Sequence, residues 1–139
     1  MRSLKPILLV EDDSVDAMTV KRALKDLKVT NLLFHTLNGE EALNHLRDKN
    51  NGTPCVILLD LNMPKMNGIE FLKVVKADAD LKSIPVVVLT TSQEEQDIVE
   101  SFKLSAAGYI VKPVDYKKFV EAMRMIDIYW TLSELPNGE

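Results

Sequence analysis

The chain contains several short apolar runs that are almost unbroken, and this pattern restricts the fold more than any other feature. Ile7–Val10, Val56–Leu59 and Val86–Leu89 show no alternation of apolar and polar residues. An unbroken apolar run is typical of a parallel strand that is covered on both faces, whereas a half-exposed strand alternates. We therefore expect a parallel sheet between two helical layers, with strands at Ile7–Val10, Leu32–Leu37, Val56–Asp60, Val86–Thr90 and Tyr109–Val111.

Apolar residues at helical spacing follow each predicted strand. Because strand and helix alternate five times, the sequence predicts an α/β fold with a doubly wound parallel sheet and right-handed crossovers. Leu32–Leu37 contains the polar His35 and Thr36, which suits a position nearer an edge. The expected helices are Val15–Leu27, with Ser14 as its cap, then Glu40–Lys49, a third through Ile69, Leu72 and Val75, a fourth through Ile98 and Phe102, and a last from about Tyr116 towards Leu132.

Length and charge exclude several classes of protein. A chain of 139 residues is long enough for one domain with a full core, so we expect a single domain over residues 1–139, with a core at about 6–125 and a helical extension to about 135. A net charge of -4 argues against nucleic-acid binding. The lone Cys55 indicates a reducing compartment. No apolar stretch approaches the roughly 20 residues of a membrane span, so we expect a cytoplasmic protein.

Polar residues stand where four of the predicted strands end. Glu11, Asp12 and Asp13 follow the first strand, Asp60 ends the third, Thr90 ends the fourth and Lys112 follows the fifth. The carboxyl ends of parallel strands meet at one edge of a sheet, where ligands bind. Clustered carboxylates repel one another unless a hard cation such as Mg²⁺ neutralises them. Acids after strands can instead cap helices; for Asp13 both readings are equally supported, whereas Asp12 and Asp60 together favour a metal site.

The remaining polar residues carry less information. Lys112 precedes Pro113, so it lies in a restricted turn from which its ammonium group could bind a phosphoryl oxygen. Thr90 is followed by Thr91, and the sequence does not say which hydroxyl faces the site. His35 and His45 have no partners at metal-ligand spacing, and we interpret them as ordinary strand and helix-surface residues.

Four motifs together resemble the receiver domain of two-component response regulators, over essentially Pro6–Met125. They are ILLVEDD at Ile7–Asp13, LLDLNMPKMNG at Leu58–Gly68, PVVVLTTS at Pro85–Ser92 and GYIVKP at Gly108–Pro113. Each motif alone is moderate evidence, but their order and spacing within five β/α units make the match specific. The resemblance implies a flavodoxin-like fold with a five-stranded parallel sheet in the order 2-1-3-4-5.

The resemblance also implies roles for individual residues. Asp60 would be the phosphoacceptor, taking a phosphoryl group from a sensor histidine kinase and signalling through protein contacts. A carboxylate can act as such a nucleophile, and phosphoryl transfer needs mainly positioning and charge neutralisation. The resemblance implies that Asp12 and Asp60 are Mg²⁺ ligands, that Glu11 acts through water and that the Asn62 carbonyl is a further ligand; Mn²⁺ could replace Mg²⁺. The implied phosphoryl-binding and switch residues are Thr90, Lys112 and Tyr109. The implied Lys112–Pro113 peptide bond is cis.

Two further expectations concern dephosphorylation and assembly. Asn62 and Ser92 flank the approach of a hydrolytic water, and neither is an obvious base, so we expect slow self-dephosphorylation. The last helix is apolar around nearly its whole circumference, which is typical of a buried helix. This tail resembles small regulators paired with bacterial phytochrome-type kinases. We expect a homodimer through the last helix and its neighbours, with contacts from Phe119, Met123, Ile126, Tyr129 and Trp130, or else a wrap of the helix onto its own domain.

Three other functions use related chemistry. An intermediate phosphorelay carrier has the same site, and the sequence does not separate it from a terminal regulator. A phosphohydrolase with an aspartyl nucleophile would need D-x-D-x-T at that position, where this chain has Asn62 and Pro64 in place of the second Asp and the Thr. A nucleotide-binding module would need a glycine-rich first loop, where this chain has acids. We therefore expect a signalling protein rather than an enzyme, with an unknown downstream protein partner.

Overall fold

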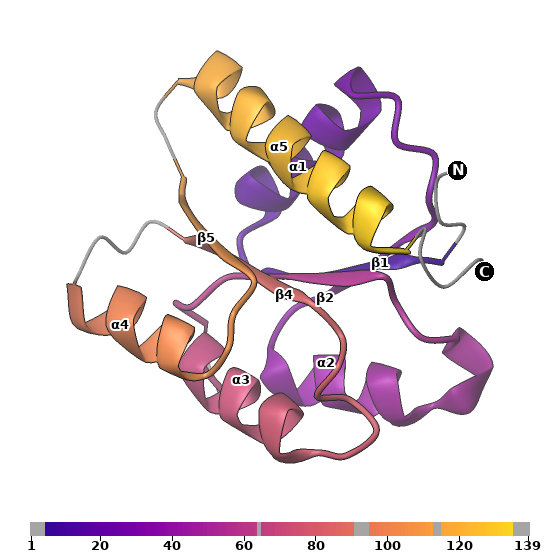
Figure 1. The fold of residues 1–139 in the computed structure, drawn as a ribbon, viewed down its shortest axis with the longest axis vertical. Helices are drawn as coiled ribbons and strands as arrows, with labels where there is room; N and C mark the ends of the chain where they lie inside the picture. The colour runs from indigo at the N-terminus through magenta and orange to yellow at the C-terminus, as the bar shows by residue number, and fades with distance from the viewer. Residues whose placement is uncertain (1–4, 64, 91–94, 113–114, 135–139) are drawn as a thin grey trace.

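A computed structural model describes residues 5–63, 65–90, 95–112 and 115–134 of the chain, without the side chains of 95, 96, 99 and 126–134. Strand and helix alternate along the described chain (Figure 1). The elements are β1 (Ile7–Val10), α1 (Ser14–Asp26), β2 (Leu33–Thr36), α2 (Gly39–Arg47), a 3₁₀ turn (Lys49–Asn51), β3 (Val56–Leu59), α3 (Gly68–Ala77), β4 (Val86–Thr90), α4 (Glu95–Lys103), β5 (Gly108–Val111) and α5 (Tyr116–Glu134).

The five strands form one parallel sheet in the order β2-β1-β3-β4-β5, which confirms the predicted fold. Helices α1 and α5 cover one face, and α2, α3 and α4 cover the other (Figure 1). Alternate residues of each central strand enter opposite layers: Leu8 and Val10 pack in one core cluster, and Ile7 and Leu9 pack in the other. Both faces are therefore apolar, which is the physical reason for the unbroken apolar runs.

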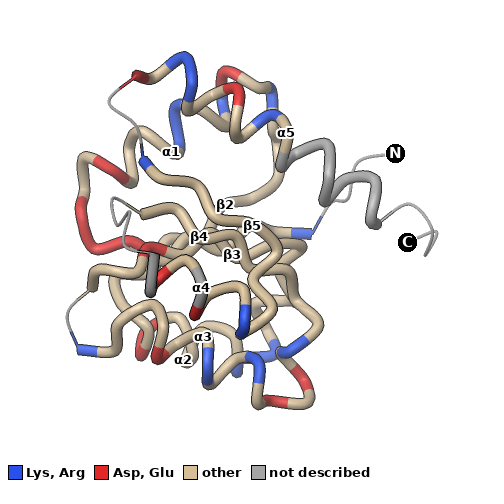
Figure 2. Tube along the Cα trace, turned by 60° about the vertical axis from the view of Figure 1, so that its left-hand side comes forward, with Lys and Arg blue, Asp and Glu red and all other residues tan. Residues whose placement is uncertain are grey.

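The sheet sits between layers that carry the charges (Figure 2). In that view the strands carry few charged residues, and lysine and arginine are scattered over helices and loops rather than gathered on one face. No helix within the described ranges has the length and hydropathy needed to cross a lipid bilayer.

Helix α1 differs from the prediction at its start. Asp13, not Ser14, is the N-cap, because its side chain accepts a hydrogen bond from the Asp16 backbone N–H at 2.9 Å. Ser14 is instead the first helical residue. The capping interpretation of Asp13 is thus the correct one.

Helix α2 is shifted relative to the predicted Glu40–Lys49. It begins at Gly39, because the Asn38 side chain accepts a hydrogen bond from the Glu41 backbone N–H at 3.0 Å. It ends at Arg47, because Asp48 adopts an extended backbone and starts the 3₁₀ turn. The Asn38 side-chain cap at the start and the extended backbone of Asp48 at the end, rather than apolar periodicity, set these boundaries.

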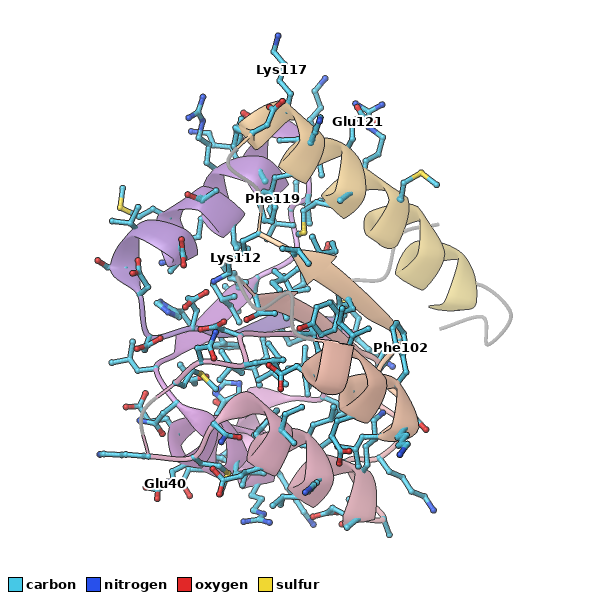
Figure 3. All side chains as sticks on the ribbon, turned by 90° about the vertical axis from the view of Figure 1, so that its left-hand side faces the viewer. Glu40, Phe102, Lys112, Lys117, Phe119 and Glu121 are labelled. Atoms are coloured by element: carbon cyan, nitrogen blue, oxygen red, sulfur yellow. The ribbon has the colours of Figure 1, made fainter. Side chains whose placement is uncertain are left out.

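Two of the residues on α5 that are predicted to form a dimer contact lie instead in the core of the domain. Phe119 and Met123 are buried in the core cluster beneath α1 and α5, with 3% and 0% of their surfaces exposed. Phe119 points from α5 into the interior in Figure 3. Side chains in the core of their own domain are not available to a second copy, so these two residues are not dimer contacts. The side chains of Ile126, Tyr129 and Trp130 lie outside the described residues.

Gly68, the first residue of α3, lies against the backbone that carries Asp60. A Cβ atom at Gly68 would lie 2.5 Å from the Asp60 carbonyl oxygen and 2.6 Å from the Leu61 Cα. Backbone atoms at that distance have to be displaced, so Gly68→Ala should lower the free energy of unfolding by about 1–3 kcal/mol, measured by urea denaturation.

Gly39→Ala is the matched control for this prediction. Gly39 is likewise the first residue of a helix with an asparagine cap, but its new Cβ would meet the side chain of Met66, whose Cγ is 2.7 Å away. A flexible methionine can move aside more readily than backbone, so Gly39→Ala should lower the free energy of unfolding by less than Gly68→Ala does. Equal losses in the two variants would contradict this interpretation.

Candidate functional site

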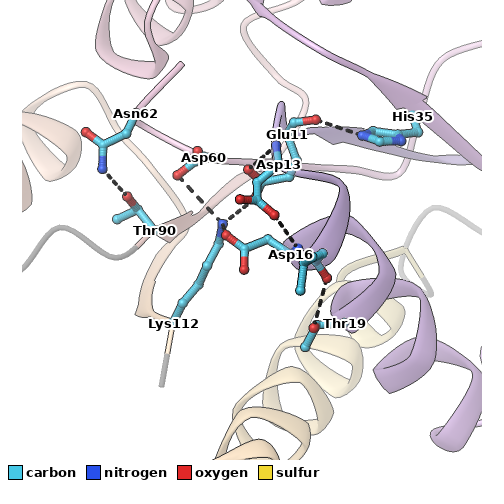
Figure 4. Close-up of polar contacts among 10 residues, drawn as sticks. Glu11, Asp13, Asp16, Thr19, His35, Asp60, Asn62, Thr90 and Lys112 are labelled. Carbon is cyan, nitrogen blue, oxygen red and sulfur yellow. Dashed lines mark hydrogen bonds and ion pairs between the residues drawn. The ribbon is translucent and has the colours of Figure 1, made fainter. Parts of the chain in front are cut away.

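Strand pairing brings the predicted site residues to one edge of the sheet. Val10 pairs with Leu59, so the residues after β1 and β3 lie side by side, and the Asp60 backbone N–H donates to the Val10 carbonyl at 3.0 Å. Thr90 pairs with Val111, and the Lys112 backbone N–H donates to the Thr90 carbonyl at 2.7 Å. The predicted convergence of strand ends is therefore present (Figure 4).

Three carboxylates form a compact cluster at this edge. One carboxylate oxygen each from Glu11, Asp12 and Asp60 lies within 4.8 Å of the others. Glu11 and Asp60 are buried and Asp12 is exposed. Three oxygen donors at this spacing, with one open to solvent, suit a hard divalent cation that keeps part of its water shell. The donor set therefore fits the predicted metal, and Asp12, Asp60 and Glu11 are the side chains that could hold it.

The Lys112 ammonium group lies among these carboxylates. Its Nζ donates to Glu11 Oε1 in a close contact, donates to Asp16 Oδ2 at 3.0 Å, and lies 3.8 Å from Asp60 Oδ1 (Figure 4). Burial opposes the charge of Lys112, but the hydrogen bond that Lys112 donates to Glu11 and the charges of Asp60 and Glu11 outweigh it and raise the lysine pKa. Lys112 therefore remains an ammonium group and supplies the positive charge of the site.

Burial has the larger effect on Glu11. It raises the pKa of the Glu11 carboxyl from 4.5 to about 7, against the opposing hydrogen bond and charge of Lys112. The folded state therefore holds a proton at pH values where the unfolded chain has lost it. The resulting stabilisation is fully present below about pH 4.5 and is lost as the pH rises through about 7.

Glu11→Gln should remove this pH dependence. Without divalent metal, the free energy of unfolding of the unmodified protein minus that of Glu11→Gln should fall by up to about 3 kcal/mol between about pH 5 and pH 8. Urea denaturation of both proteins across this range measures the difference. A difference that grows with rising pH would contradict the raised pKa.

Thr90 and Asn62 contact each other on the other side of Asp60. Thr90 is fully buried, and its Oγ1 accepts a hydrogen bond from Asn62 Nδ2 at 3.4 Å. The structure thus brings Thr90 to the predicted place beside Asp60, with Asn62 bonded to its hydroxyl. Tyr109 is partly buried against the core cluster on the side of α2, α3 and α4. Ser92, Thr91 and Pro113, including the predicted cis bond, lie outside the described residues.

Two contacts were not predicted from the sequence. Asp16 bonds to Lys112, and the His35 ring nitrogen Nε2 lies 2.7 Å from the Glu11 carbonyl oxygen. Asp16 lies in the first turn of a helix that begins directly after the acidic run Glu11-Asp12-Asp13, and this closeness in sequence could have suggested that it lies near the site. His35 gave no such signal, because its partner is a backbone atom of Glu11, 24 residues away in the sequence.

Comparison with known proteins supports this site. Residues 7–124 match the family model "Response regulator receiver domain". The chain is 38% identical to the response regulator Rcp1 of Synechocystis over 130 residues, which are 91% of this chain and 88% of Rcp1. The crystal structure of the Mn²⁺-bound form of Rcp1 superposes with a TM-score of 0.83, over 91% of this chain and 94% of that one.

Structures of phytochrome-associated regulators are also similar. The phosphorylated cyanobacterial phytochrome response regulator RcpA has a TM-score of 0.83 at 38% identity, over 92% of this chain and 94% of that chain. The bacteriophytochrome response regulator RtBRR is 47% identical with a TM-score of 0.76, over 88% of this chain and 77% of that chain. With the fold, the acidic cluster and the family match in agreement, the chain belongs to the response regulator receiver domain family of two-component signalling.

Proposed function

We propose that this protein is a phosphorylation-activated response regulator with Asp60 as the acceptor. The observation that carries the proposal is the position of Asp60: it is 5% exposed, lies within the acidic cluster and has the Lys112 ammonium group 3.8 Å from its carboxylate. A buried carboxylate between a cation site and a fixed ammonium is suited to carry a phosphoryl group. A sensor histidine kinase is the proposed donor, and the similarity to RcpA and RtBRR favours one of phytochrome type.

The transfer requires no general base. An ionised Asp60 oxygen attacks the phosphorus atom of a phosphohistidine, forming the new O–P bond as the P–N bond breaks. The electron pair of the broken bond stays on the histidine nitrogen. When bound, Mg²⁺ supplies positive charge that offsets the charge on the phosphoryl oxygens. Asp12, Asp60 and the Asn62 carbonyl would hold it, with Glu11 acting through water; Mn²⁺, present in the Rcp1 structure, is the proposed substitute.

Phosphorylation would act by shifting a population of conformations. The Thr90 hydroxyl has to approach the phosphoryl group, so it has to give up or share its hydrogen bond with Asn62. Tyr109 would turn inward as Thr90 moves, and a downstream protein would bind the altered surface. The aspartyl phosphate would thus be recognised by another protein rather than released as a reaction product.

Self-dephosphorylation should be slow. A hydrolytic water has to be oriented by residues near Asp60, and the Asn62 amide is neutral and already bonded to Thr90. An amide cannot take a proton from water at neutral pH. The aspartyl phosphate should therefore persist well beyond a few seconds in purified protein, as measured by loss of the phosphorylated mass over time. A half-life of only a few seconds would contradict this prediction.

We also propose a homodimer, through a surface other than Phe119 and Met123. Phe102 on α4 (Figure 3) and Met125 on α5 are 52% and 68% exposed, and β5 is an edge strand whose residues are all partly exposed. Large exposed apolar side chains beside a sheet edge suit a self-complementary contact. A monomer throughout the micromolar range in analytical ultracentrifugation, with and without phosphorylation, would exclude the dimer.

The phosphorelay carrier remains the second proposal, because the same site would serve it. Incubation of the phosphorylated protein with a histidine phosphotransfer domain discriminates between the two: passage of the phosphoryl group to the histidine indicates a carrier. A cytoplasmic location is proposed on the reduced, buried Cys55.

A further inference from the structure

The Lys112 ammonium group has a partner that the proposed chemistry does not use. An ammonium group has three N–H donors, and its hydrogen bonds to oxygen reach about 3.2 Å. Glu11 and Asp16 lie within that range, whereas the 3.8 Å between Nζ and Asp60 Oδ1 is an ion pair without a hydrogen bond. In this conformation Lys112 is therefore bonded to Glu11, directly after β1, and to Asp16 on α1 rather than to the acceptor.

Asp16 is held in place by the cap of α1. Its backbone N–H donates to Asp13 Oδ1 at 2.9 Å, which fixes the first turn of the helix, and its carboxylate reaches Lys112 beside the acidic cluster (Figure 4). Asp16 itself lies outside the three carboxylates that are close enough to share a cation. Its carboxylate is 37% exposed, so it can form or lose the lysine contact at low cost in solvation.

We propose that Asp16 is a positioning residue, which holds the Lys112 ammonium on the α1 side of the site and competes with a phosphoryl group on Asp60 for it. This inference rests on the proposed function. A phosphoryl oxygen and the Asp16 carboxylate would both accept a hydrogen bond from the same ammonium. The contact with Asp16 also holds the ammonium group 3.8 Å from Asp60, one of the carboxylates that would bind a divalent cation, so the positive charge opposes a cation there less than it would in a direct contact.

Asp16→Asn should therefore change two affinities in opposite directions. Without the Asp16 charge, Lys112 moves towards Asp60 and opposes the cation, so the affinity for Mn²⁺ should fall about threefold to tenfold in calorimetry. Lys112 is also free to bind a phosphoryl group, so the affinity for beryllofluoride, a phosphoryl mimic, should rise by a similar factor at saturating Mg²⁺ in fluorine NMR. A variant that had merely lost stability would bind both ligands less well.

Two control variants test whether the effect requires a carboxylate at position 16 rather than a change in net charge. Asp16→Glu keeps a carboxylate within reach of Lys112, so both affinities should stay within about twofold of the original values. Asp26→Asn removes an acid from the end of the same helix, where it accepts a hydrogen bond from Tyr116 rather than from Lys112, and should leave both affinities unchanged. An equal change in Asp26→Asn would overturn the proposal, because net charge alone would then explain the result.

A double-mutant cycle tests whether Asp16 acts through the lysine. In a Lys112→Met background, the effect of Asp16→Asn on both affinities should fall to less than half of its original size. An undiminished effect, or no effect of Asp16→Asn in the original background, would overturn the proposal. If Asp60 were not the phosphoacceptor, the result would be a different one: beryllofluoride would bind equally well to the unmodified protein and to Asp60→Asn.

Discussion

Asp60→Asn should abolish phosphorylation by a small phosphodonor such as acetyl phosphate in the presence of Mg²⁺. The amide is close to the carboxylate in shape but lacks its charge and its nucleophilic oxygen. Intact-mass spectrometry after incubation should show the added phosphoryl group on the unmodified protein and its absence on the variant.

Asp13→Asn is the matched control. Asp13 stands beside the acidic cluster, but its carboxylate caps α1, and asparagine is an equally good cap. This variant should therefore accept the phosphoryl group much as the unmodified protein does. Equal phosphorylation of Asp60→Asn and the unmodified protein would remove Asp60 as the acceptor.

Lys112→Met should cause the second large effect, on stability. The side chain of Lys112 is 10% exposed, and those of Glu11 and Asp60 are 2% and 7% exposed, so the substitution leaves two buried carboxylates without their cation. Loss of one partner from a buried ion pair typically costs about 3–5 kcal/mol. Protonation of Glu11, whose pKa is already raised, reduces that cost, so the free energy of unfolding should fall by about 2–4 kcal/mol at pH 8 and less at pH 5.

Divalent metal should reverse much of this loss. Mg²⁺ can neutralise the same carboxylates that Lys112 neutralises, so millimolar Mg²⁺ should stabilise Lys112→Met more than it stabilises the unmodified protein in thermal unfolding. Lys76→Met is the matched control, since Lys76 is also partly buried but, within the described residues, donates to the carbonyls of Lys82 and Ile84 and to no carboxylate. Its stability should not respond to Mg²⁺ beyond the response of the unmodified protein. An equal response in both variants would contradict a cation site at Glu11, Asp12 and Asp60.

The sheet was predictable because its signal is local. Each central strand is buried on both faces, so the largely apolar runs Ile7–Val10 and Val86–Thr90 can be identified as central strands from the sequence alone. The residue after such a strand is placed by strand pairing, which is why Asp60, Thr90 and Lys112 come together as expected. Only the strand order required the resemblance to a known family.

What the sequence did not reveal depends on contacts between distant segments. The predicted start of α1 is wrong because Asp13 and Ser14 are both good caps, and only the backbone conformation decides between them. The sequence places Phe119 and Met123 in a dimer contact because an almost wholly apolar helix does not show which side faces its own core, where both residues lie. The hydrogen bond between Asp16 and Lys112 joins residues 96 positions apart, so no local pattern contains it.

The Asp60 carboxylate should carry the phosphoryl group, and chemical mapping of the phosphorylated residue decides whether it does. Borohydride reduces an aspartyl phosphate to the alcohol and leaves free carboxylates unchanged, so tandem mass spectrometry of the digested protein locates the phosphorylated residue. The predicted result is reduction at Asp60 alone, dependent on Mg²⁺ and on prior phosphorylation. Reduction at Glu11, Asp12 or Asp16, or an acid-labile phosphoryl group on His35 or His45 with Asp60 unmodified, would contradict the assignment.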